Sequence, residues 1–286
     1  MARFTCNFIS YTLTRTVDAT VVIPSATIPE SLACIPGALG RHDPAQSPEE
    51  LAAARAVGLA KALHTKKDAY PVLYLFHGLG NNHATWTGYS NVELYAEERN
   101  IAIVNFSAEN KSYVNQPDGD RFFDFIEEEL PDFVHGMFPV SSRPEDTYIA
   151  GLSMGGYGAI VHGLSRPEKY AAVGCFSAAL HIKPSSILGG NEGSVDPAYN
   201  PHALVKSLGQ RGIKPPKIYL SCGEDDMLYD INSAFRKELE SVGADTTWVS
   251  VPGFGHEWRF WDRQVEAFLD WIPRTDPYPM QPKRVC

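Results

Sequence analysis

The stretch of residues 147–160, TYIAGLSMGGYGAI, constrains the fold most, because it holds a G-x-S-x-G pentapeptide between two segments of different periodicity. The apolar and β-branched residues before it predict a strand, and the helical spacing of the apolar residues after it predicts a helix. So tight a turn needs the small residues Gly151 and Gly155 around Ser153. It lifts the serine hydroxyl clear of the sheet, and the amide of Met154 at the helix start can stabilise an oxyanion. The stretch therefore predicts a nucleophilic serine.

Strands and helices alternate from residue 71 to residue 272 with no linker that would separate a second domain. The apolar run 71–76 is typical of a central parallel strand, and residues 3–24, which break near Thr14, read as two antiparallel strands. This order predicts an α/β fold with a doubly wound, mostly parallel sheet, as a single domain over residues 1–286. Further strands are expected at 101–106, 170–176, 217–222 and 246–251, and helices at about 91–99, 121–138 (interrupted at Pro131), 201–209, 230–242 and 257–272.

Two segments depart from this alternation. Residues 25–68 are punctuated by prolines and then turn Ala-rich, with Ser47 placed to cap a helix that starts at Pro48. We interpret 25–68 as an insertion that forms either a flap near the site or a contact between copies of the chain. Residues 178–216, rich in Gly, Ser, Pro and Asn with one helical piece, are interpreted as a lid-like segment.

Composition excludes several classes of partner. With 25 Lys and Arg against 34 Asp and Glu, the chain carries a net charge of −9, and no basic cluster offers a surface to nucleic acid or to an anionic membrane. No segment approaches the roughly 18–20 apolar residues of a membrane helix, and the N-terminus does not resemble a signal peptide. We therefore expect a cytoplasmic protein. The scattered cysteines, expected to be free thiols, are Cys6, Cys34, Cys175, Cys222 and Cys286.

A serine hydroxyl needs a base, and the base needs an orienting carboxylate. In this topology the order is serine, acid, histidine, each after a strand. His256, preceded by a glycine, follows the last expected strand, and no other histidine stands at a strand end beyond the acidic turn, so we predict His256 as the base. That turn offers three acids: Asp226 is favoured because a turn of this length returns its side chain over the sheet edge, Asp225 is second, and Glu224 is a distant third.

The oxyanion needs a second amide donor. The His77–Gly80 loop follows the 71–76 strand and lies beside the serine in this topology, so we assign the amide of Leu79. Aromatic residues on loops expected near this edge either line an acyl pocket or serve ordinary packing. These are Trp86, Tyr113, Phe254 and Trp258.

Motifs for other chemistry are missing from the sequence. There is no H-E-x-x-H, no phosphate-binding G-x-x-x-x-G-K-[ST], and no dinucleotide fingerprint after the first parallel strand. We expect no cofactor and no metal.

The motifs together resemble the esterase D-like branch of the α/β-hydrolases, which includes tributyrin, feruloyl and acetyl esterases, S-formylglutathione hydrolases and mycolyltransferases. The resemblance covers roughly residues 70–273 and rests on the serine turn 151–159, the loop 77–80, the acid turn 222–228 and the histidine turn 255–258 with Trp261 beyond it. It implies an α/β-hydrolase fold. The implied residues are Ser153, Asp226 and His256 as the triad, with Leu79 and Met154 as oxyanion donors.

The resemblance is nearest to the tributyrin and feruloyl esterases, which implies a serine carboxylesterase for small-molecule esters with short acyl or aryl-acyl groups. An S-formylglutathione thioesterase is the alternative with the same machinery, and a mycolyl-type acyltransferase is disfavoured because no export signal is evident. A non-catalytic binding protein is disfavoured because all three triad residues are present. The 25–68 insertion departs from the compact members, which leaves pocket shape and homo-oligomerisation open.

Overall fold

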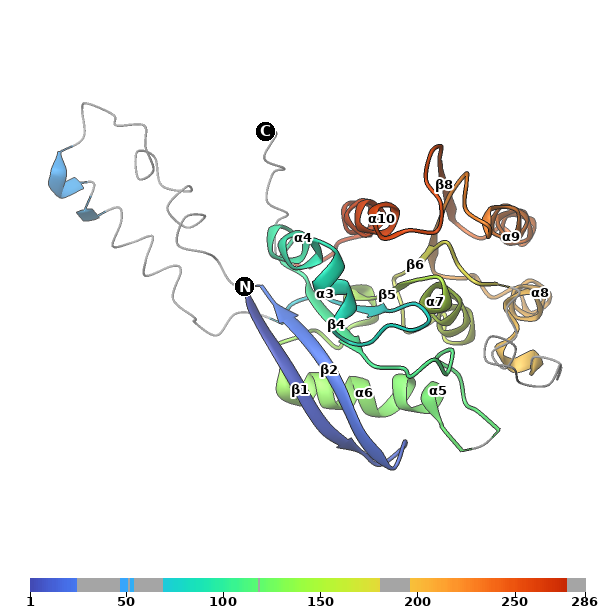
Figure 1. Ribbon diagram of the computed structural model, residues 1–286, viewed down its shortest axis with the longest axis horizontal. Coiled ribbons are helices and arrows are strands. Elements are labelled where there is room, and N and C mark those ends of the chain that lie inside the picture. The colour runs from blue at the N-terminus through green and yellow to red at the C-terminus, as the bar shows by residue number, and fades with distance from the viewer. Residues whose placement is uncertain (25–46, 51, 54–68, 118, 181–195, 277–286) are drawn as a thin grey trace.

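The structure is a computed structural model that describes residues 1–24, 47–50, 52–53, 69–117, 119–180 and 196–276. Within these residues it forms one eight-stranded sheet in the order β1-β2-β4-β3-β5-β6-β7-β8 (Figure 1). The β1–β2 and β2–β4 pairings are antiparallel and the other pairings are parallel, so the predicted fold class is confirmed. The strands are β1 Ala2–Ser10, β2 Arg15–Ile23, β3 Val72–Phe76, β4 Ala102–Phe106, β5 Thr147–Leu152, β6 Ala172–Phe176, β7 Lys217–Gly223 and β8 Thr246–Val251.

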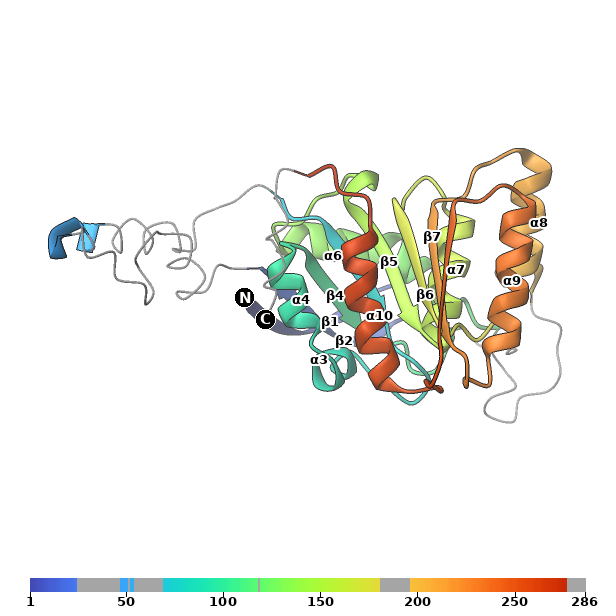
Figure 2. The same ribbon diagram turned by 90° about the horizontal axis from the view of Figure 1, so that it is seen from above.

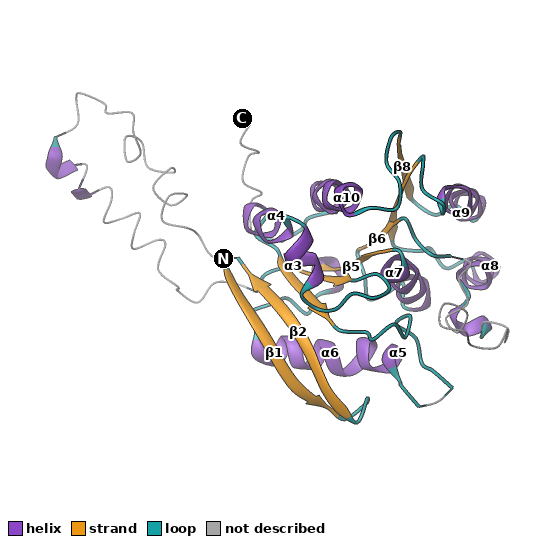
Figure 3. Cartoon of the chain, viewed as in Figure 1, coloured by secondary structure: helices purple, strands orange, loops and turns teal. Residues whose placement is uncertain are grey.

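Helices lie against both faces of the sheet (Figures 2 and 3). In Figure 2, α4 and α10 stand in front of the strands, and α6 and α7 stand behind them. The described helices are α3 Thr85–Tyr89, α4 Val92–Glu98, α5 Phe122–Asp124, η1 Phe125–Glu129, α6 Leu130–Met137, η2 Pro144–Asp146, α7 Met154–Ser165, η3 Pro197–Tyr199, α8 Pro201–Arg211, α9 Tyr229–Ser241 and α10 Trp258–Trp271.

The sheet separates two apolar layers. One joins the sheet to α6, α7, α8 and α9, and the other joins it to α3, α4 and α10. Because both faces are covered, every residue of β3, β4 and β6 is buried, which explains why these strands are continuous apolar runs in the sequence. Burial of this sheet on both sides fixes the strand ends rigidly, and the candidate site is built on those ends.

One local expectation is wrong, and one helix was not expected. The helix expected at 121–138 is not interrupted at Pro131: α5, a π-helical turn over Phe125–Glu129 and α6 follow one another without a gap. Pro131 has no N–H to donate to the carbonyl of Glu127 four residues earlier, and that carbonyl accepts from Lys169 Nζ at 2.7 Å instead. The short helix α3 was not expected, because five residues are too few to show a helical period. Within the residues described, no helix is long and apolar enough to cross a membrane.

The 25–68 segment lies largely outside the described residues, and the 178–216 segment lies partly outside them. Of the 25–68 segment, the described part shows Ser47 and Glu50 bonded reciprocally, Ser47 N–H to Glu50 Oε2 at 2.8 Å and Glu50 N–H to Ser47 Oγ at 3.2 Å, which is the expected helix cap. The flap and oligomer-contact roles of 25–68 stay predictions. Of the 178–216 segment, residues 181–195 lie outside the described part, and the rest contains η3 and α8.

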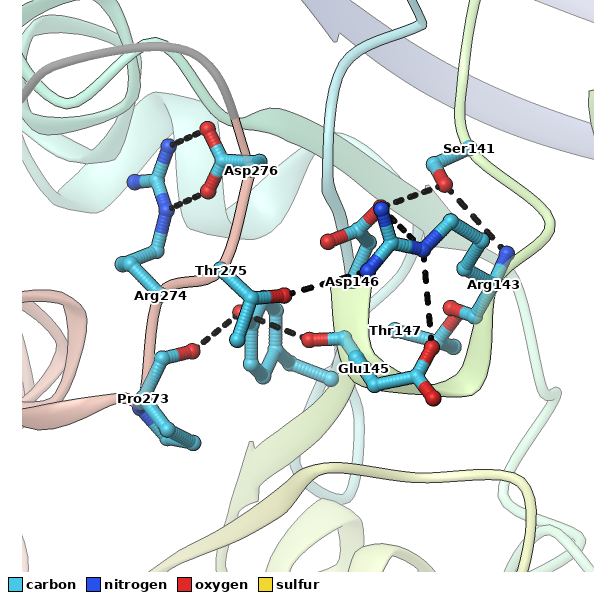
Figure 4. A network of polar contacts seen from close by, with 10 residues as sticks. Ser141, Arg143, Glu145, Asp146, Thr147, Pro273, Arg274, Thr275 and Asp276 are labelled. Atoms are coloured by element: carbon cyan, nitrogen blue, oxygen red, sulfur yellow. Dashed lines mark hydrogen bonds and ion pairs between the residues drawn. The ribbon is translucent and has the colours of Figure 1, made fainter.

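Residues 273–276, which follow α10, are hydrogen-bonded to residues near the amino-terminal end of β5 (Figure 4). The Tyr148 hydroxyl donates to the carbonyl oxygen of Pro273, and Arg143 Nη2 donates to Thr275 Oγ1 at 3.4 Å. Arg274 pairs with Asp276 and also donates to the carbonyl of Arg99 at 2.7 Å. This polar network lies at the end of the sheet opposite Ser153, because Tyr148 is near the start of β5 and Ser153 follows its end.

Candidate active site

The residues predicted for the site follow the carboxyl ends of parallel strands. Ser153 comes directly after β5, the 77–80 loop after β3, Asp226 after β7 and His256 after β8. These strands are neighbours or next neighbours in one parallel block, so their carboxyl ends meet at one edge of the sheet. The edge is where ligands bind in open α/β sheets.

Ser153 occupies a strained turn. Its φ of 52° and ψ of −114° lie in a region that a non-glycine residue rarely adopts. A Cβ atom at Gly151 would stand 2.4 Å from the carbonyl carbon of Gly155, and a Cβ at Gly155 would stand 2.5 Å from the carbonyl oxygen of Phe76. The two glycines are therefore required by close backbone approach, as the pentapeptide predicts.

Three side chains form a continuous hydrogen-bonded row. The Nε2 atom of His256 lies 3.0 Å from Ser153 Oγ, and its Nδ1 atom lies 2.9 Å and 3.1 Å from the two carboxylate oxygens of Asp226. Because a carboxylate accepts only, Nδ1 carries the proton toward Asp226 and leaves Nε2 free to accept from the serine hydroxyl. The row has the geometry of a nucleophile, a base and an orienting acid.

The structure separates the three neighbouring acids. Asp226 is buried, whereas Asp225 and Glu224 are exposed, and Glu224 Oε1 accepts from Ser250 Oγ at 3.1 Å. Of the three, Asp226 is the one whose carboxylate contacts His256.

Asp226 is held by several donors. Its Oδ1 accepts from the backbone N–H of Leu228 at 2.9 Å, and Ser177 donates a further hydrogen bond. Burial raises the pKa of Asp226, but the hydrogen bonds from His256, Ser177 and Leu228 outweigh it and hold the pKa below its ordinary value. The carboxylate therefore stays ionised and can stabilise a protonated His256.

Two backbone amides beside Ser153 have no acceptor among the described residues, those of Leu79 and Met154. Met154 is the first residue of α7, so its N–H is one of the unpaired donors of a helix start. Gly78 brings the other amide close: a Cβ there would stand 3.6 Å from Ser153 Cβ. Both amides are available to a negative oxygen.

Two supporting residues were missed by the sequence reasoning, Asn232 and Ser177. Asn232 on α9 is fully buried, accepts from Ala178 N–H at 3.1 Å and donates to the carbonyls of Ala178 and Leu228, so it ties the loop after β6 to the acid turn. Ser177 accepts from Trp261 Nε1 at 3.2 Å and contacts Asp226. Ser177 follows a strand end and was open to detection on that ground, whereas no local pattern singles out Asn232.

Two of the four aromatic residues expected to line a pocket do not reach solvent. Trp86 and Tyr113 have no exposed surface, because Trp86 packs under the site with its Nε1 donating to Phe76 O, and Tyr113 stacks on the ring of Phe76. In the structure these two residues serve ordinary packing, which was the second of the two roles left open for them. Trp258 and Phe254 are partly exposed and stay candidates; the Trp258 ring stacks on Tyr89 at 5.3 Å.

No group of three or more His, Cys, Asp or Glu side chains within the described residues is arranged to hold a metal ion.

Comparisons with known proteins agree with this geometry. A curated acetyl esterase of Caldicellulosiruptor saccharolyticus is 29% identical and covers 71% of this chain and 83% of its own. The fluorophosphonate-binding serine hydrolase F of Staphylococcus aureus superposes with a TM-score of 0.75 at 24% identity, covering 94% of this chain and 97% of its own. The S-formylglutathione hydrolase of the same organism superposes with a TM-score of 0.74 at 25% identity, covering 94% and 98%.

These structural likenesses establish the fold as that of the α/β-hydrolase serine hydrolases. The family model described as "putative esterase" matches residues 59–271, a span that includes β3, the Ser153 turn, the acid turn and His256. Because this match takes in well over half of the chain, the protein belongs to the esterase family.

Proposed function

We propose that this serine esterase hydrolyses small-molecule esters with short acyl or aryl-acyl groups through an acyl-enzyme on Ser153. The observation that carries the proposal is the row Ser153–His256–Asp226 with two unpaired amides beside the serine. The family supports the reaction class. The acetyl esterase relative supports a short acyl group such as acetyl or butyryl. The resemblance of the motifs to feruloyl esterases supports the aryl-acyl (feruloyl-type) esters.

Acylation begins at the Ser153 hydroxyl. His256 Nε2 removes its proton as the oxygen attacks the ester carbonyl, and the developing oxyanion accepts from the amides of Leu79 and Met154. Asp226 stabilises the imidazolium that forms and keeps the ring in the correct orientation. His256 then gives the proton to the leaving alcohol, and the acyl group remains on Ser153.

Deacylation repeats these steps with water. His256 takes a proton from the water molecule, the resulting hydroxide attacks the acyl-enzyme, and the same two amides hold the second oxyanion. The serine leaves with the proton that His256 returns. Every step uses groups present at this edge of the sheet.

A thioester hydrolase is the second candidate, because an S-formylglutathione hydrolase is one of the similar structures. The same acyl-enzyme chemistry would cleave a thioester, with a thiolate as the leaving group. The two candidates differ in the group that the enzyme recognises on the leaving side and share the roles of Ser153 and His256.

A turnover panel separates the candidates. It compares p-nitrophenyl acetate, butyrate and octanoate with methyl ferulate and S-formylglutathione. We expect fast turnover of acetate or butyrate that falls as the acyl chain lengthens. Dominant turnover of S-formylglutathione would instead make the protein a thioesterase.

The panel needs two serine variants. Ser153→Ala removes the proposed nucleophile and is expected to abolish turnover. Ser165→Ala, at the far end of the same helix, removes a hydroxyl without a hydrogen-bond partner among the described residues and is expected to keep it. Silence of the wild-type chain on all five substrates would bring back the non-catalytic binding protein.

We also propose a cytoplasmic location and leave room for a homo-oligomer. The first is supported by the described cysteines Cys6, Cys175 and Cys222, which are free thiols. The second is supported by β1, an edge strand with exposed Phe4 and Ile9. Fractionation and size-exclusion chromatography with light scattering test the two proposals.

A further inference from the structure

The loop that follows β4 (residues 107–113) is hydrogen-bonded to the loop that carries the Leu79 amide (residues 77–80). Tyr113 donates its hydroxyl proton to the carbonyl oxygen of His77 at 2.8 Å, and Asn110 Oδ1 accepts from the backbone N–H of Gly80 at 2.7 Å. The backbone N–H of Ala108 donates to His77 Nε2 at 3.0 Å. Leu79 thus lies between His77 and Gly80, whose backbone groups are both hydrogen-bonded to side chains of the 107–113 segment.

Tyr113 also touches the helix that carries the other amide. Its ring stacks on Phe76 with the ring centroids 4.2 Å apart and nearly parallel planes. On α7, a Cβ at Gly158 would stand 2.6 Å from the Tyr113 ring, so the ring lies directly on the helix backbone. One fully buried side chain therefore spans from the helix that begins at Met154 to the loop that contains Leu79.

The 107–113 segment holds an unusual backbone to make these contacts. Glu109, Asn110, Ser112 and Tyr113 have φ values of 47°, 59°, 54° and 65°, in the left-handed region that disfavours residues with a side chain. Such strain persists only where surrounding structure fixes it, and it clusters at functional sites. Two of the strained residues make the hydrogen bonds to the 77–80 loop: Tyr113 donates to His77, and Asn110 accepts from Gly80.

Two buried histidines are hydrogen-bonded to the backbone of the 107–113 segment. His162 on α7 lies with Nε2 2.9 Å from the carbonyl oxygen of Tyr113, and its Nδ1 lies 2.5 Å from Glu127 Oε1. His77 is also buried, and burial lowers its pKa to about 4, so the ring is neutral at working pH and its Nε2 can accept from Ala108.

We propose that Tyr113 and Asn110 are positioning residues that set the spacing of the two oxyanion amides, Tyr113 by bridging α7 to the His77 carbonyl and Asn110 by holding Gly80. The proposal rests on the proposed function, because the two amides matter only if an oxyanion forms at Ser153. Neither side chain needs to touch the substrate, so they act on the transition state and not on ground-state binding.

The first test removes one hydrogen bond and keeps the ring. Tyr113→Phe is expected to lower kcat roughly tenfold to hundredfold, with KM changed by less than about twofold. The inhibition constant of a trifluoromethyl ketone, whose adduct with Ser153 carries the oxyanion, is expected to rise by the same factor. Tyr148→Phe is the matched control: it removes the hydroxyl of another tyrosine with no exposed surface, which donates to the carbonyls of Glu145 and Pro273 at the opposite end of the sheet.

The control separates positioning from stability. Both tyrosine variants are expected to lower the melting temperature, but Tyr148→Phe is expected to keep the wild-type kcat and inhibition constant. If Tyr113→Phe keeps them too, the bridging role of Tyr113 is overturned.

The second test replaces Asn110 with residues that fit its positive φ of 59°. Asn110→Gly removes the acceptor of Gly80 N–H at a φ that glycine adopts freely, and Asn110→Asp keeps an acceptor oxygen in place. We expect a kcat loss in the glycine variant and its recovery in the aspartate variant. Equal activity in both would overturn the role of Asn110.

Ser153→Ala in the same assays distinguishes failure of the positioning role from failure of the proposed function. A wild-type chain whose turnover depends on Ser153, with unaltered Tyr113→Phe and Asn110→Gly variants, overturns the positioning role alone. A wild-type chain without Ser153-dependent turnover overturns the proposed function and the positioning role with it.

Discussion

At the scale of single residues, the site depends on one buried carboxylate. Asp226 accepts from His256, Ser177 and the Leu228 amide, whereas Asp225 one position earlier points its side chain into solvent. The neighbours differ because the turn after β7 buries the side chain of Asp226 and leaves those of Glu224 and Asp225 exposed. Catalysis through His256 should therefore depend on Asp226 and not on Asp225.

Replacing Asp226 with Asn should lower kcat by about four orders of magnitude, because the amide no longer fixes the His256 tautomer or stabilises its charge. Asp225→Asn is the matched control and should leave kcat near that of the wild type. Steady-state kinetics with p-nitrophenyl acetate decide the matter. A large loss in Asp225→Asn with a small loss in Asp226→Asn would move the acid to Asp225.

Acid should weaken the contribution of Asp226 to stability. Its pKa in the folded chain lies below the ordinary 3.8, so the folded state favours the ionised form. This stabilisation is complete well above pH 4 and is lost as the pH falls through the folded pKa. Urea unfolding of wild type and Asp226→Asn should show a gap in unfolding free energy at neutral pH that narrows below about pH 4. A gap that widens in acid would contradict the assignment.

At the scale of elements, the helix α7 lies in close contact with the strand β3 and with Tyr113. Gly155 lies against the carbonyl of Phe76 on β3, and Gly158 lies against the ring of Tyr113. The small residues of α7 thus allow the helix to approach the sheet, which places the Met154 amide beside the β3 loop. Shape at this junction determines the geometry of the site.

Gly155→Ala should destabilise the fold by about 1–3 kcal/mol and reduce activity, because its Cβ would stand 2.5 Å from a backbone oxygen that cannot move freely. Gly136→Ala on α6 is the control: that glycine is exposed with nothing within 4 Å of an added Cβ, so alanine should stabilise the helix by up to about 1 kcal/mol. Denaturant unfolding measures both. A harmless Gly155→Ala would mean that the junction is looser than the structure shows.

At the scale of the whole molecule, the sequence predicts what is local or repeated. Three short motifs could be recognised because their geometry depends on adjacent residues: the Ser153 turn, the acid turn and the histidine turn. The alternation of strands and helices likewise indicates the parallel sheet. The antiparallel β1–β2 pair was also visible, because alternation with a break near Thr14 marks a hairpin.

What depends on distant packing was not visible. Tyr113 looks like a loop aromatic free to line a pocket, but the fold buries it between Phe76 and α7. Asn232 lies in the middle of an amphipathic helix, and its bonds to Ala178 and Leu228 join residues that are far apart in the chain. The π-helical turn at 125–129 also escapes a pattern that is read with an α-helical period.

The central claim is that an acyl group passes through Ser153, and trapping that intermediate tests it most directly. Rapid mixing of the chain with p-nitrophenyl acetate, followed by acid quench and mass spectrometry, should show a burst of about one equivalent of p-nitrophenol and an acetyl group on the peptide that contains Ser153. Ser153→Ala should show neither. Turnover without an adduct on Ser153, or with the acetyl group on another residue, would contradict the account.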